Sequence, residues 1–215
     1  MKTEKALNIA LVLSIITIFY NIIEGIFSIS YGMNDDTLAL LGFGVDSFVE
    51  VISGLGIAHM IWRMKSGDGE HTDLFERQAL KITGFSFYLL TGGLIAGAAV
   101  NFIQNNQPVT TIVGIIISVI SILTMFFLMR YKLKIGRILN SDAIIADANC
   151  TRSCFYLSII LLASSGLYEI FQIGYIDTIG SLGIAWFAFN EGREAFEKAK
   201  SNTLSCCNSN CSRNN

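Results

Sequence analysis

The sequence predicts an all-α polytopic membrane protein: a six-helix transmembrane bundle with both termini in the cytoplasm. Three observations predict this fold class. Apolar residues make up 52% of the 215 positions and charged residues only 15%, with a mean hydropathy of +0.54. The apolar residues are gathered into six blocks, each close to the roughly 20 residues that span a hydrocarbon core. Among the loops that join these blocks, those containing Lys and Arg alternate with those that contain neither.

The six apolar blocks cover residues 6–30, 37–62, 79–103, 109–129, 141–170 and 175–192. Inside a bilayer the backbone polar groups must be satisfied within the segment, so blocks of this length are predicted to be helices and not barrel strands. The first block is not expected to be a cleaved signal peptide, because its apolar stretch is too long and it contains Asn21 and Glu24.

The distribution of basic residues predicts the orientation of the bundle. The loops at 31–36, 104–108 and 171–174 contain neither Lys nor Arg. The positive-inside rule therefore places the other loops and both termini in the cytoplasm. We assign Lys132 to the loop between the fourth and fifth helices. The residues on the basic side are Lys2, Lys5, Arg63, Lys65, Arg77, Lys81, Arg130, Lys132, Lys134, Arg137, Arg193, Lys198, Lys200 and Arg213.

Two parts of the chain are predicted: a membrane domain at 1–194 and a tail at 195–215. The tail is rich in Ser and Asn and has almost no apolar surface to bury, so it is predicted to be disordered without a ligand.

An odd count of five cysteines does not indicate a disulfide framework. The net charge of −2 and the lack of a basic stripe argue against nucleic-acid binding. Three tail cysteines are possible ligands of a soft ion: Cys206, Cys207 and Cys211.

Four side chains in the predicted helices form two matching pairs. Asp46 and Glu50 lie in the second block, and Cys150 and Cys154 lie in the fifth. Ionisable groups at bilayer depth are costly and usually face a water-filled path or a partner. Each pair is spaced i, i+4, so a helix presents both of its side chains on one face, one turn apart. Both pairs are therefore candidate ligands of a cation.

The depths of the two pairs allow them to meet. The second block begins at the outer side near Thr37, and the fifth begins at the inner side near Ser141. Asp46 and Cys150 each lie nine positions further along, which is about 13 Å at 1.5 Å per residue. Carboxylate oxygen and thiolate sulfur together suit a tetrahedral cation such as Zn²⁺. The predicted metal site consists of Asp46, Glu50, Cys150 and Cys154.

Simpler interpretations compete with this site. Cys150 and Cys154 are also compatible with small buried packing residues. Asp147 lies three residues before Cys150 and is a candidate for a supporting or entrance group. In the first block, Asn21 and Glu24 either line an exit path or bond to neighbouring helices.

Four further polar residues lie at or beyond the ends of the predicted helices. Asp68 and His71, in the loop between the second and third helices, are either accessory metal ligands or part of a solvated polar loop. Glu169 and Asp177 fall near the outer boundary of the membrane and are expected to be solvated.

The two paired motifs resemble those of the cation diffusion facilitator family of divalent-metal/proton antiporters. Residues 45–50 are similar to the family's acidic pair on the second helix, and residues 146–154 to the facing pair on the fifth, including the preceding Asp. Glu50 stands where the family has Asp, and Cys150 and Cys154 stand where it has His or Asp and then Asp. The chain is most similar to short members that lack the family's cytoplasmic C-terminal domain.

This resemblance implies a multi-pass protein of the plasma or inner membrane, not an enzyme, that exports divalent metal such as Zn²⁺ or Cd²⁺ in exchange for protons. It implies a homodimer in the lipid bilayer with no prosthetic group, its ligands being the metal ions and protons. The alternative is a membrane metal-sensing or thiol-redox protein without transport activity. Redox chemistry needs bridging cysteines, whereas Cβ atoms spaced i, i+4 lie about 6 Å apart, beyond the ~3.5–4.5 Å of a disulfide.

Overall fold

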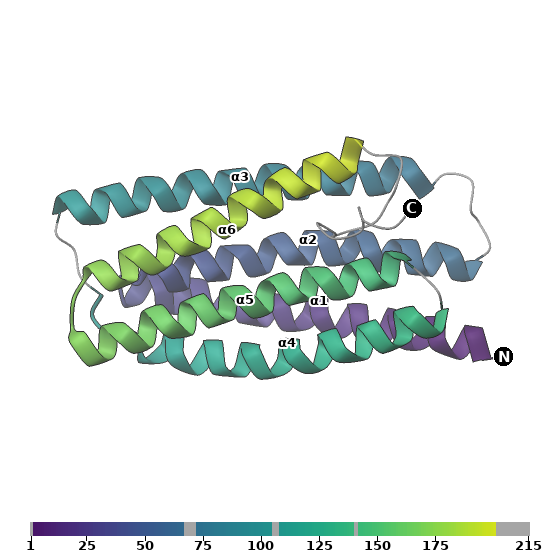
Figure 1. The fold of residues 1–215 in the computed structure, drawn as a ribbon, viewed down its shortest axis with the longest axis horizontal. Coiled ribbons are helices and arrows are strands. Elements are labelled where there is room, and N and C mark those ends of the chain that lie inside the picture. Colours follow the sequence, from purple (N-terminus) through teal and green to yellow (C-terminus); the bar gives the residue numbers. More distant parts are fainter. Residues whose placement is uncertain (1, 67–71, 105–107, 140–141, 201–215) are drawn as a thin grey trace, which may run out of the picture.

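The computed structural model describes residues 2–66, 72–104, 108–139 and 142–200, and within them it contains helices and no strand. The predicted all-α fold is confirmed. Figure 1 shows the helices side by side along the long axis of the molecule. They are α1 (Lys2–Asn34), α2 (Leu38–Ser66), α3 (Thr72–Gln104), α4 (Ile112–Leu139), α5 (Asp142–Phe171) and α6 (Tyr175–Lys200).

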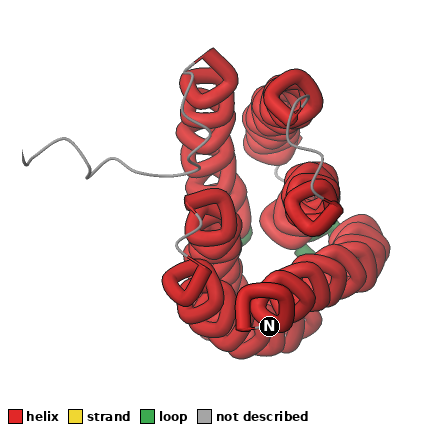
Figure 2. Tube along the Cα trace, turned by 90° about the vertical axis from the view of Figure 1, so that its right-hand side faces the viewer, coloured by secondary structure: helices red, strands yellow, loops and turns green. Residues whose placement is uncertain are grey.

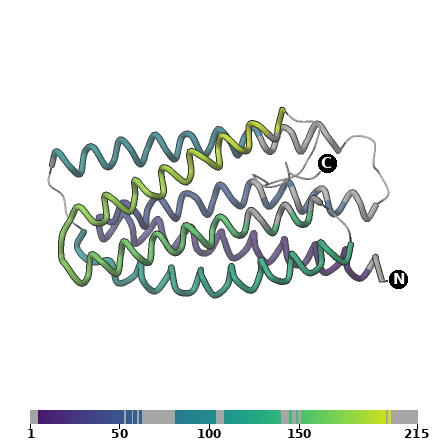
Figure 3. The backbone as a smooth tube through the Cα atoms, viewed as in Figure 1, coloured from purple at the N-terminus to yellow at the C-terminus, as the bar shows by residue number. Residues whose placement is uncertain are grey.

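Tight turns join α1 to α2 and α5 to α6 at one end of the bundle. Asp36 and Gln172 adopt positive φ angles of 52° and 54°, the left-handed conformation that commonly ends a helix. The backbone N–H of Thr37 bonds to the carbonyl of Gly32 at 2.9 Å, which reverses the chain into α2. We call this end the outer end, and the end where α1 begins and α6 finishes the inner end (Figure 3).

The helices are long, and several extend past the predicted blocks. Five of them, α1 to α5, contain a segment long and apolar enough to cross a membrane. The sixth predicted block is also a helix, but α6 continues beyond it into a charged inner end, with an exposed ion pair of 3.6 Å between Arg193 and Glu197. α6 continues through the predicted domain boundary at 194, and the rest of the predicted tail, 201–215, lies outside the described residues.

α2 lies at the centre of the bundle and packs against α1, α3, α5 and α6. The closest helix pairs are α1 with α2, α3 with α6, and α4 with α5, and Figure 2 shows the helices nearly end-on. The apolar core lies between α2, α3, α5 and α6. Its members include Leu40, Phe43, Val49, Leu90, Leu94, Leu157, Leu161 and Ile184.

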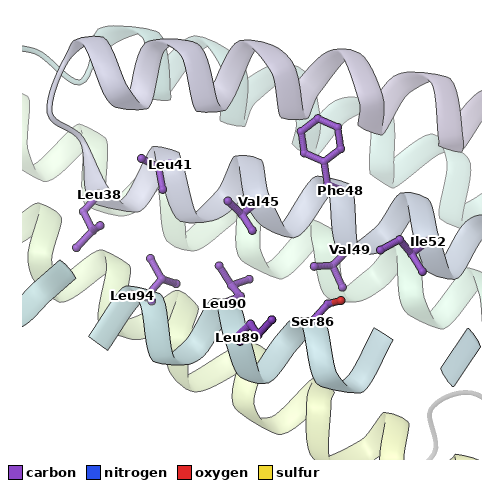
Figure 4. A pocket seen from close by; sticks show the side chains of 11 residues that line it. Leu38, Leu41, Val45, Phe48, Val49, Ile52, Ser86, Leu89, Leu90 and Leu94 are labelled. Carbon is purple, nitrogen blue, oxygen red and sulfur yellow. The ribbon is translucent and has the colours of Figure 1, made fainter. Parts of the chain in front are cut away.

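An apolar groove of about 450 Å³ runs between α2 and α3 (Figure 4). Val45, Val49 and Ile52 line it from α2, and Leu89 lines it from α3. Apart from Ser86 its lining side chains are apolar, so the groove offers hydrocarbon contacts and not cation ligands. This groove is therefore not a candidate cation site.

Candidate functional site

Asp46 and Glu50 lie one turn apart on α2, on the side that faces the interior of the bundle. Asp46 is only 2% exposed and Glu50 is partly buried. The Oδ1 atom of Asp46 makes no hydrogen bond with the described part of the chain. A buried carboxylate oxygen without a donor carries an uncompensated desolvation cost. The pair is thus placed to accept a proton or a cation.

α1 supplies direct partners to the acidic pair. The Asn21 side chain, 1% exposed, donates through Nδ2 to Glu50 Oε2 at 2.9 Å, while its own Oδ1 makes no hydrogen bond within the described residues. Glu24 is also buried and accepts hydrogen bonds from Tyr20 at 2.8 Å and from Ser47 at 3.1 Å. Both sequence alternatives for Asn21 and Glu24 remain compatible with these contacts, but both residues belong to the surroundings of Asp46 and Glu50.

Hydroxyl groups extend this polar region to α4 and α5. The Ser121 hydroxyl on α4 lies close enough to Glu24 to interact with its carboxylate. Ser158 on α5 lies 2.8 Å from Ser121, oxygen to oxygen. A chain of polar groups therefore runs from α5 through α4 to the carboxylate on α1.

A further acid approaches from α6. The Glu191 side chain accepts a hydrogen bond of 2.7 Å from Ser153, which lies between Cys150 and Cys154 in sequence. Asp46 lies within electrostatic range of Glu191 and of Glu24. Glu191 was overlooked in the sequence, although it falls within the predicted sixth block and the cost of a charge in the membrane would have identified it.

Lys132 occupies an unexpected position. Its assignment to a loop is wrong, because α4 continues to Leu139 and buries this lysine to 2% exposure. Lys and Arg are good helix formers and this stretch contains no proline, so the helix continues through Gly136 and the loop prediction failed. The Lys132 Nζ atom lies 3.1 Å from the Thr151 hydroxyl on α5, and its charge is within electrostatic range of Glu50.

The structure describes the side chain of only one of the two predicted cysteine ligands on α5. Cys154 is buried and packs against Met125 and Leu128 of α4. The side chains of Cys150 and Asp147 lie outside the described residues, although both positions are in α5. Among the residues that are described, there is no group of three or more Asp, Glu, His or Cys side chains placed to hold one metal ion. The predicted accessory ligands Asp68, His71, Cys206, Cys207 and Cys211 also lie outside the described residues.

The carboxylates at the outer end have structural partners. The expectation that Asp177 is solvated is wrong, since it is 1% exposed and accepts hydrogen bonds from the backbone N–H of Leu38 at 2.8 Å and of Ala39 at 3.3 Å. It therefore caps the start of α2 from α6. Glu169 is partly buried and accepts the N–H of Thr111 at 2.6 Å. These two acids hold the outer ends of the helices together.

The sequence of the membrane part decides the family. The profile of the cation efflux transmembrane domain matches residues 9–202. The chain belongs to the cation efflux family. This membership confirms the resemblance seen in the paired motifs and establishes a multi-pass membrane protein.

One relative is the uncharacterized transporter MJ0449 of Methanocaldococcus jannaschii. The two are 26% identical over 175 residues, which make up 80% of this chain and 62% of that protein. The chain thus spans less than two thirds of the length of this relative.

Proposed function

We propose that this cation efflux protein is a secondary transporter that exports divalent heavy metals, Zn²⁺ or Cd²⁺, in exchange for protons. The substrate would bind between α2 and α5, at Asp46, Glu50, Cys150 and Cys154. The observation that carries the proposal is the buried acidic pair on α2, with an Asp46 oxygen that makes no hydrogen bond within the described residues. Family membership and the contact between α2 and α5 support it.

The chemistry of the donors supports a soft divalent substrate. Thiolates are softer than carboxylates and favour Zn²⁺ and Cd²⁺, whereas Mn²⁺ and Mg²⁺ prefer oxygen ligands. An ordinary thiol has a pKa of about 8.5, so without metal the site would hold protons that a bound metal displaces. Metal and protons then exclude each other at one site, as antiport requires.

The test is transport by the purified chain in proteoliposomes under an imposed pH gradient. We expect uptake of Zn²⁺ and Cd²⁺ with counterflow of protons, and poor transport of Mn²⁺. The variants Asp46→Ala, Glu50→Ala, Cys150→Ala and Cys154→Ala should each abolish flux while still inserting into the membrane. Full flux in either cysteine variant would remove helix five from the site, and no flux of any metal by the wild type would overturn the transport proposal itself.

A double variant tests selectivity. Replacing both thiols, Cys150→Asp with Cys154→Asp, should preserve transport but weaken the preference for Cd²⁺ over Mn²⁺, because the new ligands are oxygen atoms. Competition between the two metals for uptake measures this ratio. An unchanged ratio would mean that the cysteines do not set selectivity.

A further inference from the structure

Lys132 is a charged group buried within the helix bundle. It lies 20 residues after the start of α4, and its side chain is 2% exposed. Burying an ammonium group is costly unless it is paired and hydrogen-bonded. Its contacts include the Thr151 hydroxyl at 3.1 Å, and Thr151 directly follows Cys150 in sequence. The lysine is therefore held against the segment of α5 that carries the proposed ligands.

The helix geometry places Lys132 on the inner side of the acidic residues. On α4, Ser121 is at the level of Glu24, and Lys132 lies 11 residues nearer the inner end, about 16 Å along the helix. Long side chains on a helix point back toward its N-terminus. For α4 the N-terminus is at the outer end, so the ammonium group extends from the inner side toward the acids.

The charge of Lys132 acts on the same carboxylate that a substrate would need. Glu50 interacts with the Lys132 charge and is surrounded by the negative charges of Asp46 and Glu24. In the empty site, the ammonium group offsets part of the repulsion among these acids. A divalent cation bound at Glu50 would instead be repelled by Lys132, because like charges interact more strongly in a protein interior than in water.

We propose that Lys132 is a tethered cation that competes with the transported metal for the acidic site, lowering its affinity so that the metal can be released. This role rests on the proposed function, because it presupposes a divalent substrate at Asp46 and Glu50. Lys132 is a positioning residue here: it binds no metal and acts through Glu50. A transporter needs affinity low enough for release on the far side, and a built-in positive charge provides a means of setting it.

The test compares charge variants at this position by titration of the full-length protein in detergent with Cd²⁺ alone. Removing the charge with Lys132→Met or Lys132→Gln should tighten Cd²⁺ binding about tenfold. In proteoliposomes the same variants should show a lower KM and a lower kcat, because release becomes slow. Lys132→Arg keeps the charge and should stay near the wild-type affinity. Lys134→Met, on the same helix at an exposed position, is the matched control and should change neither value.

Each result distinguishes the two proposals. If the wild type binds Cd²⁺ and the neutral variants bind it with equal or lower affinity, the competitor role is overturned while the transport proposal stands. If neither neutral variant yields folded protein, Lys132 is a structural counter-ion and the competitor role is again overturned. If the wild type neither binds nor moves Zn²⁺, Cd²⁺, Co²⁺ or Mn²⁺, the proposed function fails and the role of Lys132 fails with it.

Discussion

The two sides of α2 differ in kind. Toward α3 the helix presents Val45 and Val49 to an apolar groove and core. Toward α1 it presents Ser47 to the Glu24 carboxylate and Glu50 to the Asn21 amide, and Glu50 also lies within electrostatic range of the Lys132 ammonium group on α4. In a membrane, apolar side chains can contact either lipid tails or other helices at similar cost. Polar side chains need partners within the protein. The polar side is therefore the informative one for function.

α1 shows the same division between residues 14 and 28. Its outward surface carries large apolar side chains that are more than half exposed, such as Phe19 and Ile23. Its inward surface repeats polar residues at helical spacing, all of them buried: Ser14, Thr17, Asn21, Glu24 and Ser28. This arrangement is the reverse of a soluble helix, and it directs polar groups toward the acidic pair on α2.

The largest expected effect is a difference in metal flux between variants at two adjacent positions that lie on opposite sides of α2. Asp46→Asn keeps the shape of the side chain but removes the charge, so we expect metal flux to be lost. Val45→Ala, one residue away in the apolar groove, should retain most of the wild-type flux. Both are measured in proteoliposomes after matching the amount of inserted protein. Equal loss in the two variants would show that the division between the sides does not reflect function.

Two glycines test the packing on the two sides of α2: Gly44 of α2, next to α1, and Gly93 of α3, which lines the apolar groove. A Cβ atom on Gly44 would lie 2.8 Å from the backbone nitrogen of Ile29 on α1, whereas one on Gly93 meets no atom within 4 Å. Gly44→Ala should therefore destabilise the protein by about 1–3 kcal/mol. Gly93→Ala should be neutral or stabilise it by up to about 1 kcal/mol, through helix propensity. Thermal unfolding in detergent measures both, and similar unfolding temperatures would contradict the close α1–α2 contact.

The smallest expected effect concerns the outer end of α2, where the helix begins. Asp177→Ala removes the acceptor for the N–H groups of Leu38 and Ala39. Loss of such a cap costs about 0.5–2 kcal/mol, so the unfolding temperature should fall modestly. Metal affinity should be unchanged because Asp46 lies two turns further along α2. A changed affinity with normal stability would place Asp177 in the transport path.

Most of the fold was predictable because apolar blocks of membrane-spanning length have one structural solution. The pair Asp46 and Glu50 was predictable for a related reason, since i, i+4 spacing determines a shared helix face without knowledge of neighbours. The role of α5 as a source of ligands remains a prediction, because the Cys150 side chain lies outside the described residues and Cys154 packs on α4. The burial of Asp177 was not predictable, since its partners are the N–H groups of a helix 138 positions away.

The sequence by itself determined the helical class, the alternation of basic and neutral loops, and the location of the acidic pair on the second helix. These follow from local rules: the length of apolar blocks and the 3.6-residue period. The tertiary structure decided which side of α2 is polar, that Asn21, Glu24 and Glu191 surround the acidic pair, and that Lys132 lies inside the bundle. Helix packing sets these features, because a charge is tolerated in a membrane only where a partner from another helix meets it.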